Sequence, residues 1–310
     1  MATDVLSRPV SGPVPAVADL HRPISRWRRI KNRAWWLACG LGLVLVLIPV
    51  VWILAGVLVH AVEHWSAGVL TTPFTGTGGG LSNAIVGTFV LIVGVAILAS
   101  AIGVGAGIYL AEWARSGRTT FLRSASELLA GIPSIVFGYV GYVSLVVYFH
   151  WGYSLYAALI VLSLLVVPYV AKATEVSINQ VPVAYREGAE AVGMTRTTMM
   201  RRIMLKAALP GITTGIVIAV AVSVGETAPL LYTAGWSNSN PTFTLKHSPL
   251  GYLTYAVWTF WDDPSPKVQA LSEDAALLLV VLVLGLIIGS RVLVRLTQKH
   301  APDTERRRDS

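Results

Sequence analysis

Long runs without charged residues, separated by short polar segments, dominate the pattern of this chain. The run at 34–62 is 29 residues long, whereas about 20 residues suffice for a helix to cross a bilayer. The run at 128–171 lacks acidic, Lys and Arg residues for 44 positions, which suits two spans joined by a tight turn at 150–152. The pattern therefore predicts an all-α integral membrane protein with six transmembrane helices, at about 34–62, 83–110, 132–149, 154–176, 211–235 and 275–292.

Between the spans, the pattern predicts a polar turn at 112–127 and a longer polar loop at 177–210. Residues 250–261 are aromatic and amphipathic, and we expect an extracytoplasmic interfacial helix there, lying along the membrane surface. The run at 34–62 exceeds the apolar core of about 7–15 residues in a cleaved signal peptide, so we expect an uncleaved first span. The expected organisation is an N-terminal tail, a first span, a core with five further spans and a basic C-terminal tail, at 1–33, 34–62, 83–292 and 293–310.

The composition agrees with this interpretation and indicates an orientation. The chain is 54% hydrophobic and 13% charged, whereas soluble domains are about 25% charged. A net charge of +8 could suggest nucleic acid, but the basic residues lie in loops between apolar runs, so no nucleic acid is expected. Of 24 Lys and Arg residues, all but Lys246 and Lys267 lie on the side of the termini and of the 177–210 loop. The positive-inside rule makes that side the cytoplasm.

Motifs for catalysis are missing from the sequence. There is no Gly-x4-Gly-Lys-Ser/Thr and no His-Glu-x-x-His, and the single Cys39 cannot form an internal disulfide. Gly103, Gly105 and Gly107 lie inside a predicted span, where small residues favour close helix packing. We therefore expect no enzyme activity, no cofactor and no metal site on this chain.

The stretch from 185 to 212 is the most basic internal segment, and its pattern predicts two short helices. Pro182 suits the first turn of one helix, where its missing N–H is no loss. Gly193 suits the residue just past a helix end, where φ is often positive. Thr195 can cap a second helix, and Pro210 ends that helix or joins it at an angle to the next span.

This stretch resembles the cytoplasmic loop of ABC importer permeases, which docks into a cleft of the ATP-hydrolysing subunit. Two positions depart from the family pattern: Gly188 replaces an alanine and Lys206 replaces a proline. The alternative is a solvated basic loop that only sets the topology. The resemblance implies a set of ATPase-coupling residues, which are Arg186, Glu187, Gly188, Ala189, Gly193, Ile203 and Leu205.

A second informative stretch, 225–231, reads Gly-Glu-Thr-Ala-Pro-Leu-Leu. Glu226 interrupts an apolar span, at an insertion cost of about 2.5–3.5 kcal/mol, so it should face water or the bundle interior. Pro229 removes a backbone hydrogen bond and can bend the helix. This stretch resembles a signature of PstA-type phosphate permeases, and 131–136, Gly-Ile-Pro-Ser-Ile-Val, resembles a second one. The resemblance covers about 83–292.

Several roles are open for the carboxylate of Glu226. It can pair with a cation, such as Lys172 or a residue of a partner permease. It can be protonated, or it can accept a hydrogen bond from a protonated phosphate. It can also be a structural hydrogen-bonding group near the helix bend. Val222 stands where many family members carry an arginine, so no anion-binding arginine is carried over. Our candidates for the translocation path are Glu226, Thr227, Pro229, Ser134 and Ser223.

The resemblance implies a type I ABC importer permease fold and a place in a phosphate importer of the plasma (inner) membrane of a prokaryote. The implied partners are a PstC-type companion permease, two PstB-type ATP-binding subunits that bind ATP and magnesium, and an extracytoplasmic PstS-type phosphate-binding protein. One alternative is a permease of the same fold for another oxyanion such as sulfate or molybdate. The other is a stand-alone ion-coupled transporter or channel, which should carry paired intramembrane charges and inverted repeats.

Overall fold

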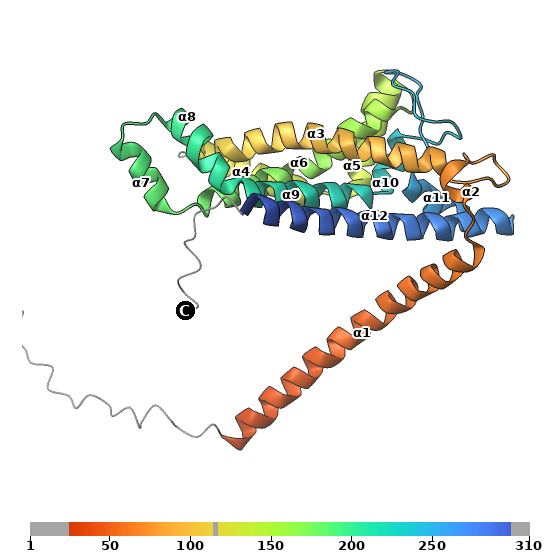
Figure 1. The fold of residues 1–310 in the computed structure, drawn as a ribbon, viewed down its shortest axis with the longest axis horizontal. Helices are drawn as coiled ribbons and strands as arrows, with labels where there is room; N and C mark the ends of the chain where they lie inside the picture. Colours follow the sequence, from red (N-terminus) through yellow and green to blue (C-terminus); the bar gives the residue numbers. More distant parts are fainter. Residues whose placement is uncertain (1–24, 114–116, 299–310) are drawn as a thin grey trace, which may run out of the picture. The chain divides into compact units, whose positions relative to one another are not determined.

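A computed structural model describes residues 25–113 and 117–298 of the chain, and Figure 1 shows their course. Within these residues the secondary structure is helical, apart from isolated β-bridges between Phe74 and Gly79 and between Ser154 and Ser248. The helices, of which η2 and η3 are π-helices, are α1 (Arg26–His64), α2 (Gly68–Thr71), α3 (Ser82–Glu112), α4 (Gly117–Gly131), α5 (Ser134–Gly141), η2 (Tyr142–Tyr148), α6 (Leu155–Asn179), α7 (Val183–Ala191), α8 (Arg196–Met199), η3 (Met200–Met204), α9 (Leu205–Val224), α10 (Ala228–Thr233), α11 (Leu253–Phe260) and α12 (Pro266–Gln298).

The chain divides into two units, 1–56 and 57–310, with the boundary inside α1. In the first unit, the described residues form one apolar helix that contains Pro49. In the second unit, α3, α6, α9 and α12 run alongside one another, with α7 and α8 at one end and α2 and α11 at the other (Figure 1). The main core lies where α3, α6 and α9 meet.

Among the residues that the structure describes, five helices are long and apolar enough to cross a membrane, and a sixth span results if one bent helix pair is counted. The expected spans at 34–62, 83–110 and 275–292 lie inside α1, α3 and α12, and the one at 154–176 begins at the residue that caps α6. The bent pair joins 120–131 to 134–148 at an angle of 93°. Pro133 accounts for the break, because proline lacks an N–H and disfavours helical backbone at the residue before it.

The polar turn expected at 112–127 is mostly helix, since α4 begins at Gly117. Its charged residues Arg123 and Glu127 form ion pairs with α6, which the hydropathy pattern of the chain does not reveal. The expected fifth span, 211–235, also differs. The helix is continuous from 196 to 224, with Pro210 inside it, and a separate α10 begins at Ala228.

Two other expectations concern local packing. A Cβ added to Gly103 would lie 2.6 Å from the Cβ of Val170, and one added to Gly107 would lie 2.5 Å from the Ala171 carbonyl oxygen. Close packing is therefore confirmed at these two glycines, although Gly105 has open space beside it. At the expected interfacial segment, α11 buries Leu253, Ala256 and Phe260 in the protein and leaves Trp258 and Trp261 exposed. Its place at a membrane surface stays a prediction.

Candidate functional site

The turn between α7 and α8 forms as its sequence predicts. Gly193 has a φ of 72°, and its N–H donates to the Glu190 carbonyl, while the Met194 N–H donates to the Ala189 carbonyl. Thr195 caps α8, because its hydroxyl oxygen accepts a hydrogen bond from the Thr198 N–H at 3.3 Å. Both features give hydrogen-bond partners to backbone groups that would otherwise be unsatisfied at a helix end.

The helix α7 has one face against the protein and one exposed face. Ala189 is buried on a cluster that contains three methionines, Met199, Met200 and Met204, and Ile203 and Leu205 are partly buried against the same cluster. Most of the remaining surface of α7 is exposed, where the small and apolar residues Val183, Ala184, Gly188 and Ala191 lie beside the charged Glu187 and Glu190. A Cβ added to Gly188 would meet no atom within 4 Å. The exposed face is thus open to the close approach of another surface.

The residues expected in the coupling loop therefore fall into an exposed group and a group that faces the protein. Glu187, Gly188 and Gly193 are exposed. Ala189 is buried in the protein and cannot itself contact a docking partner.

Arg186 also points into the protein. It pairs there with Glu112, a buried acidic residue that the sequence pattern does not single out. Its Nη1 donates to Oε2 of Glu112, the last residue of α3, at 2.6 Å. The Glu112 side chain is 2% exposed, so this is a buried carboxylate with a charge-assisted hydrogen bond. In the sequence pattern, Glu112 marks only the start of the polar turn at 112–127. Its partner lies 74 positions away, which no local pattern reveals.

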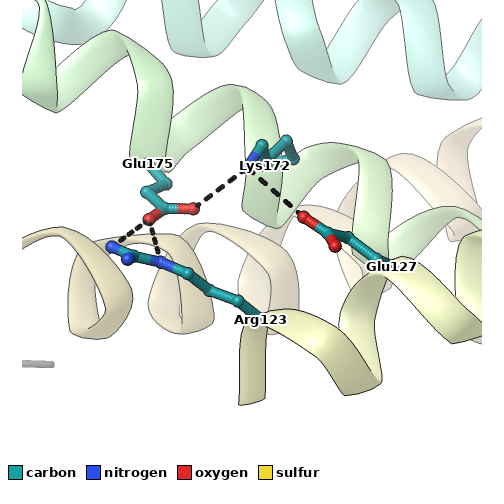
Figure 2. Close-up of polar contacts among 4 residues, drawn as sticks. All are labelled: Arg123, Glu127, Lys172 and Glu175. Carbon is teal, nitrogen blue, oxygen red and sulfur yellow. Dashed lines mark hydrogen bonds and ion pairs between the residues drawn. The ribbon is translucent and has the colours of Figure 1, made fainter. Parts of the chain in front are cut away.

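A second group of charges joins α4 to α6 at the same end of the bundle (Figure 2). The Nε and Nη2 atoms of Arg123 lie 2.7 and 2.6 Å from Oε1 of Glu175, whose side chain is 5% exposed. The Nζ of Lys172 lies 3.8 Å from Glu175 and 4.0 Å from Glu127. Lys172 and Glu127 are well exposed, so these longer contacts contribute little, and the Arg123–Glu175 pair dominates. The four residues line a cavity of about 230 Å³ and have balanced charges, which gives no preference for anions.

The two stretches expected to form the translocation path meet through α5 and α10. A Cβ added to Gly138 of α5 would lie 2.7 Å from the Cα of Pro229, which sits in the first turn of α10. The rings of Tyr139 and Tyr232 contact each other across this junction. Ser134 is the first residue of α5 and is half-buried.

Glu226 and Thr227 lie in the break between α9 and α10, not inside a continuous span, and both are half-buried. The Glu226 carbonyl accepts a hydrogen bond from the Thr254 hydroxyl at 3.2 Å. Over the described part of the chain, no ion pair reaches the Glu226 carboxylate, and Lys172 pairs with Glu127 and Glu175 instead. Buried Ser223 donates its hydroxyl to the Val220 carbonyl. Pro229 lies in the first turn of the new helix α10, a position that suits proline.

Beside this break, Ser223, Thr254 and Tyr252 line a small cavity of about 10 Å³, which is room for about one water molecule. The Tyr252 hydroxyl is buried and has no hydrogen-bond partner among the described residues. Burial raises the pKa of the Tyr252 phenol, so this group stays neutral at physiological pH. No group of three or more His, Cys, Asp or Glu side chains that could hold a metal ion occurs in the residues that the structure describes.

Comparisons with known proteins agree over most of the chain. The profile of the family described as "binding-protein-dependent transport system inner membrane component" matches residues 103–299. The chain is 51% identical over 289 residues to the phosphate transport system permease protein PstA 2 of Mycobacterium bovis, covering 93% of this chain and 95% of that protein. It is 36% identical over 280 residues to the PstA protein of Yersinia pestis, covering 89% and 94%.

Solved structures share the fold. An inward-facing structure of the MetNI methionine ABC transporter superposes with a TM-score of 0.58 at 19% identity, covering 70% of this chain and 97% of that chain. A bacterial ABC transporter involved in the import of the polysaccharide alginate superposes with a TM-score of 0.59 at 14% identity, covering 88% and 99%. At these identities the likeness concerns the fold alone.

Proposed function

The chain belongs to the family of inner-membrane components of binding-protein-dependent transport systems, and from this premise we propose that it is the permease subunit of an ATP-driven importer of inorganic phosphate. The observation that carries the proposal is the packing of α5, which begins within the first phosphate-permease stretch, against α10, which begins within the second. Relatives named as phosphate transport permeases, 51% and 36% identical, match along nearly their whole length. The chain is a multi-pass membrane protein and is not itself an enzyme.

In this proposal the bent pair α4–α5 counts as one span, which gives six spans of the type I importer arrangement. In the same proposal, the N-terminal tail at 1–33, the 177–210 loop and the C-terminal tail at 293–310 lie in the cytoplasm, with the first span at 34–62 and the permease core at 83–292. A PstC-type permease completes the translocation path, and a PstS-type binding protein delivers phosphate from outside. Two PstB-type subunits bind ATP and magnesium, and this chain needs no cofactor of its own.

The helix α7 is the proposed coupling helix. Its exposed face of small and apolar residues, opened by Gly188, fits a cleft on an ATPase subunit. Its other face is anchored in the permease through Ala189 and Arg186. Closure of the ATPase dimer would then move the spans, because one face of α7 is held by each partner.

The test is uptake of radiolabelled phosphate by proteoliposomes that contain the four kinds of subunit. We expect uptake only with ATP and with the binding protein, and competition by phosphate but not by sulfate or molybdate. The control omits this chain. Competition by sulfate or molybdate alone would identify a different oxyanion, and uptake by this chain without ATP or partners would contradict the proposal.

Glu226 is the proposed polar group of the translocation path, because its carboxylate is half-buried at a helix break without a described ion-pair partner. Glu226→Gln keeps the shape of the side chain and removes its charge. We expect phosphate uptake to fall roughly tenfold while the complex assembles, the effect of losing about 1.5 kcal/mol from one charge-assisted hydrogen bond. The exposed Glu63→Gln on α1 is the control. Full uptake by Glu226→Gln would remove this residue from the path.

A further inference from the structure

Two buried carboxylates mark the same end of the helix bundle. Glu112 is the last residue of α3, and Glu175 lies in the last turns of α6. Each is held by an arginine from a neighbouring element, Glu112 by Arg186 of α7 and Glu175 by Arg123 of α4. These two arginine pairs thus connect α7 and α4 to the α3–α6 pair.

The α3–α6 pair is packed so closely that its helices should move together. Gly107 of α3 lies against the backbone of Ala171 and the side chain of Thr174, and Gly103 lies against Val170. There is no space for a methyl group at either glycine. Interiors packed at this density transmit displacement with little compression. A force applied to the end of α3 therefore reaches α6.

We propose that Glu112 is a positioning residue that receives the motion of α7, and that Glu175 passes this motion to α4 through Arg123. From α4 the connection continues across the break before Pro133 into α5, which packs against Pro229 of α10. The relay joins the docking helix to the helix break that contains Glu226. This inference rests on the proposed function, because α7 is loaded only if an ATPase subunit binds it.

The geometry explains why these two pairs are stiff connections. Separating Glu112 from Arg186 leaves a buried charge without another ion-pair partner among the described residues, which is strongly unfavourable. Glu175 keeps only the longer contact with Lys172 when Arg123 leaves it. The element that carries the arginine must therefore follow the carboxylate. The contacts of Lys172 in Figure 2 lack this property, since both are at least 3.8 Å long and Lys172 is exposed. The same cluster thus offers a matched control.

The first experiment measures phosphate transported per ATP hydrolysed in proteoliposomes with the complete transporter, after co-purification has shown that the ATPase subunit is bound. We expect at least a tenfold fall in this ratio for Glu112→Gln and for Arg186→Gln, and no further fall in the double variant, because both substitutions break one link. The exchange of charges, Glu112→Arg with Arg186→Glu, should restore part of the ratio. Glu63→Gln, at an exposed carboxyl of α1 outside the docking helix, should change the ratio less than twofold.

The second experiment compares Arg123→Gln with Lys172→Gln. We expect a fall in the ratio for Arg123→Gln and a change of less than twofold for Lys172→Gln. Equal effects of the two variants would overturn the second step of the relay.

Glu112 is buried and lies outside the docking loop, so an effect of Glu112→Gln on the ratio does not arise from a lost ATPase contact. A merely structural role would lower the amount of assembled complex and leave the ratio of each assembled complex unchanged. If Glu112→Gln does not assemble, Arg186→Lys decides, since it keeps the charge and loses the geometry of the guanidinium. For Arg186→Lys we expect the phosphate transported per ATP to fall at least threefold. Unchanged ratios would overturn the relay, whereas absence of ATP-dependent uptake by the native complex would overturn the proposed function instead.

Discussion

Gly193 is the residue on which the turn after α7 depends, because its φ of 72° lies in the region that favours glycine. A β-branched residue there is strained by roughly 1–3 kcal/mol, which should displace α7 from its seat. We therefore expect Gly193→Val to lower phosphate transport per ATP severalfold in the reconstituted complex. Gly285→Val is the control, since Gly285 has open space beside it and no positive φ. Normal coupling in Gly193→Val would count against the docking function of this turn.

Tyr252 gives a prediction about pH. Its phenol lies between α10 and α11, outside the candidate spans, and burial raises its pKa. In the unfolded chain the phenol ionises above about pH 10, whereas in the folded chain it stays protonated. Because the unfolded chain then binds fewer protons, the folded state loses stability as the pH rises above about 10. Tyr252→Phe should remove this loss and change the unfolding free energy at pH 7 by less than about 1 kcal/mol.

Thermal unfolding of the purified chain in detergent at pH 7 and pH 10.5 checks this prediction. The exposed Tyr148→Phe is the matched control and should keep the native pH dependence. A native pH profile in Tyr252→Phe would refute the assignment.

Residues whose role depends on near neighbours were predictable from the sequence, and residues paired over long distances were not. The backbone of Gly193 and the cap of Thr195 follow from a few adjacent positions. Glu112 and Glu175 depend on arginines 74 and 52 positions away. The charge pattern along the chain marked their region only as polar, because it contains no information about which helices pack together.

At the scale of elements, apolar run length predicted α3, α6 and α12 well, because helices that cross lipid must be long and uncharged. It failed for α4, whose charges are neutralised by α6, and for the end of α9. There the sequence Gly-Glu-Thr-Ala-Pro was read as a bend inside one span. The structure shows a complete break followed by a short helix.

The packing of α3 on α6 gives a prediction at this scale. Gly107→Leu should force the helices apart and lower the unfolding free energy by about 1–3 kcal/mol, the range for overpacked cores. Gly105→Leu on the same helix meets open space and should change it by less than about 0.5 kcal/mol. Thermal unfolding of the purified complex compares the two variants. Equal destabilisation by both would contradict the close contact at Gly107.

At the scale of the whole molecule, the proposed orientation places the exposed residues Arg201 and Lys246 on opposite sides of the membrane. In a Cys39→Ser background, Lys246→Cys should react with a membrane-impermeant thiol reagent added to intact cells. Arg201→Cys should react only after the membrane is opened, because the positive-inside bias holds its loop in the cytoplasm. Labelling of Arg201→Cys from outside would reverse the topology and with it the docking function of α7.

The three methionines beneath α7, Met199, Met200 and Met204, have a mechanical consequence. Unbranched thioether side chains adapt their rotamers to an irregular surface more easily than branched ones do. If α7 moves in each transport cycle, as proposed, it can shift on this layer without opening a void. The Arg186–Glu112 pair fixes one side of α7 to α3. The methionine side chains would let the rest of α7 change its position while staying packed.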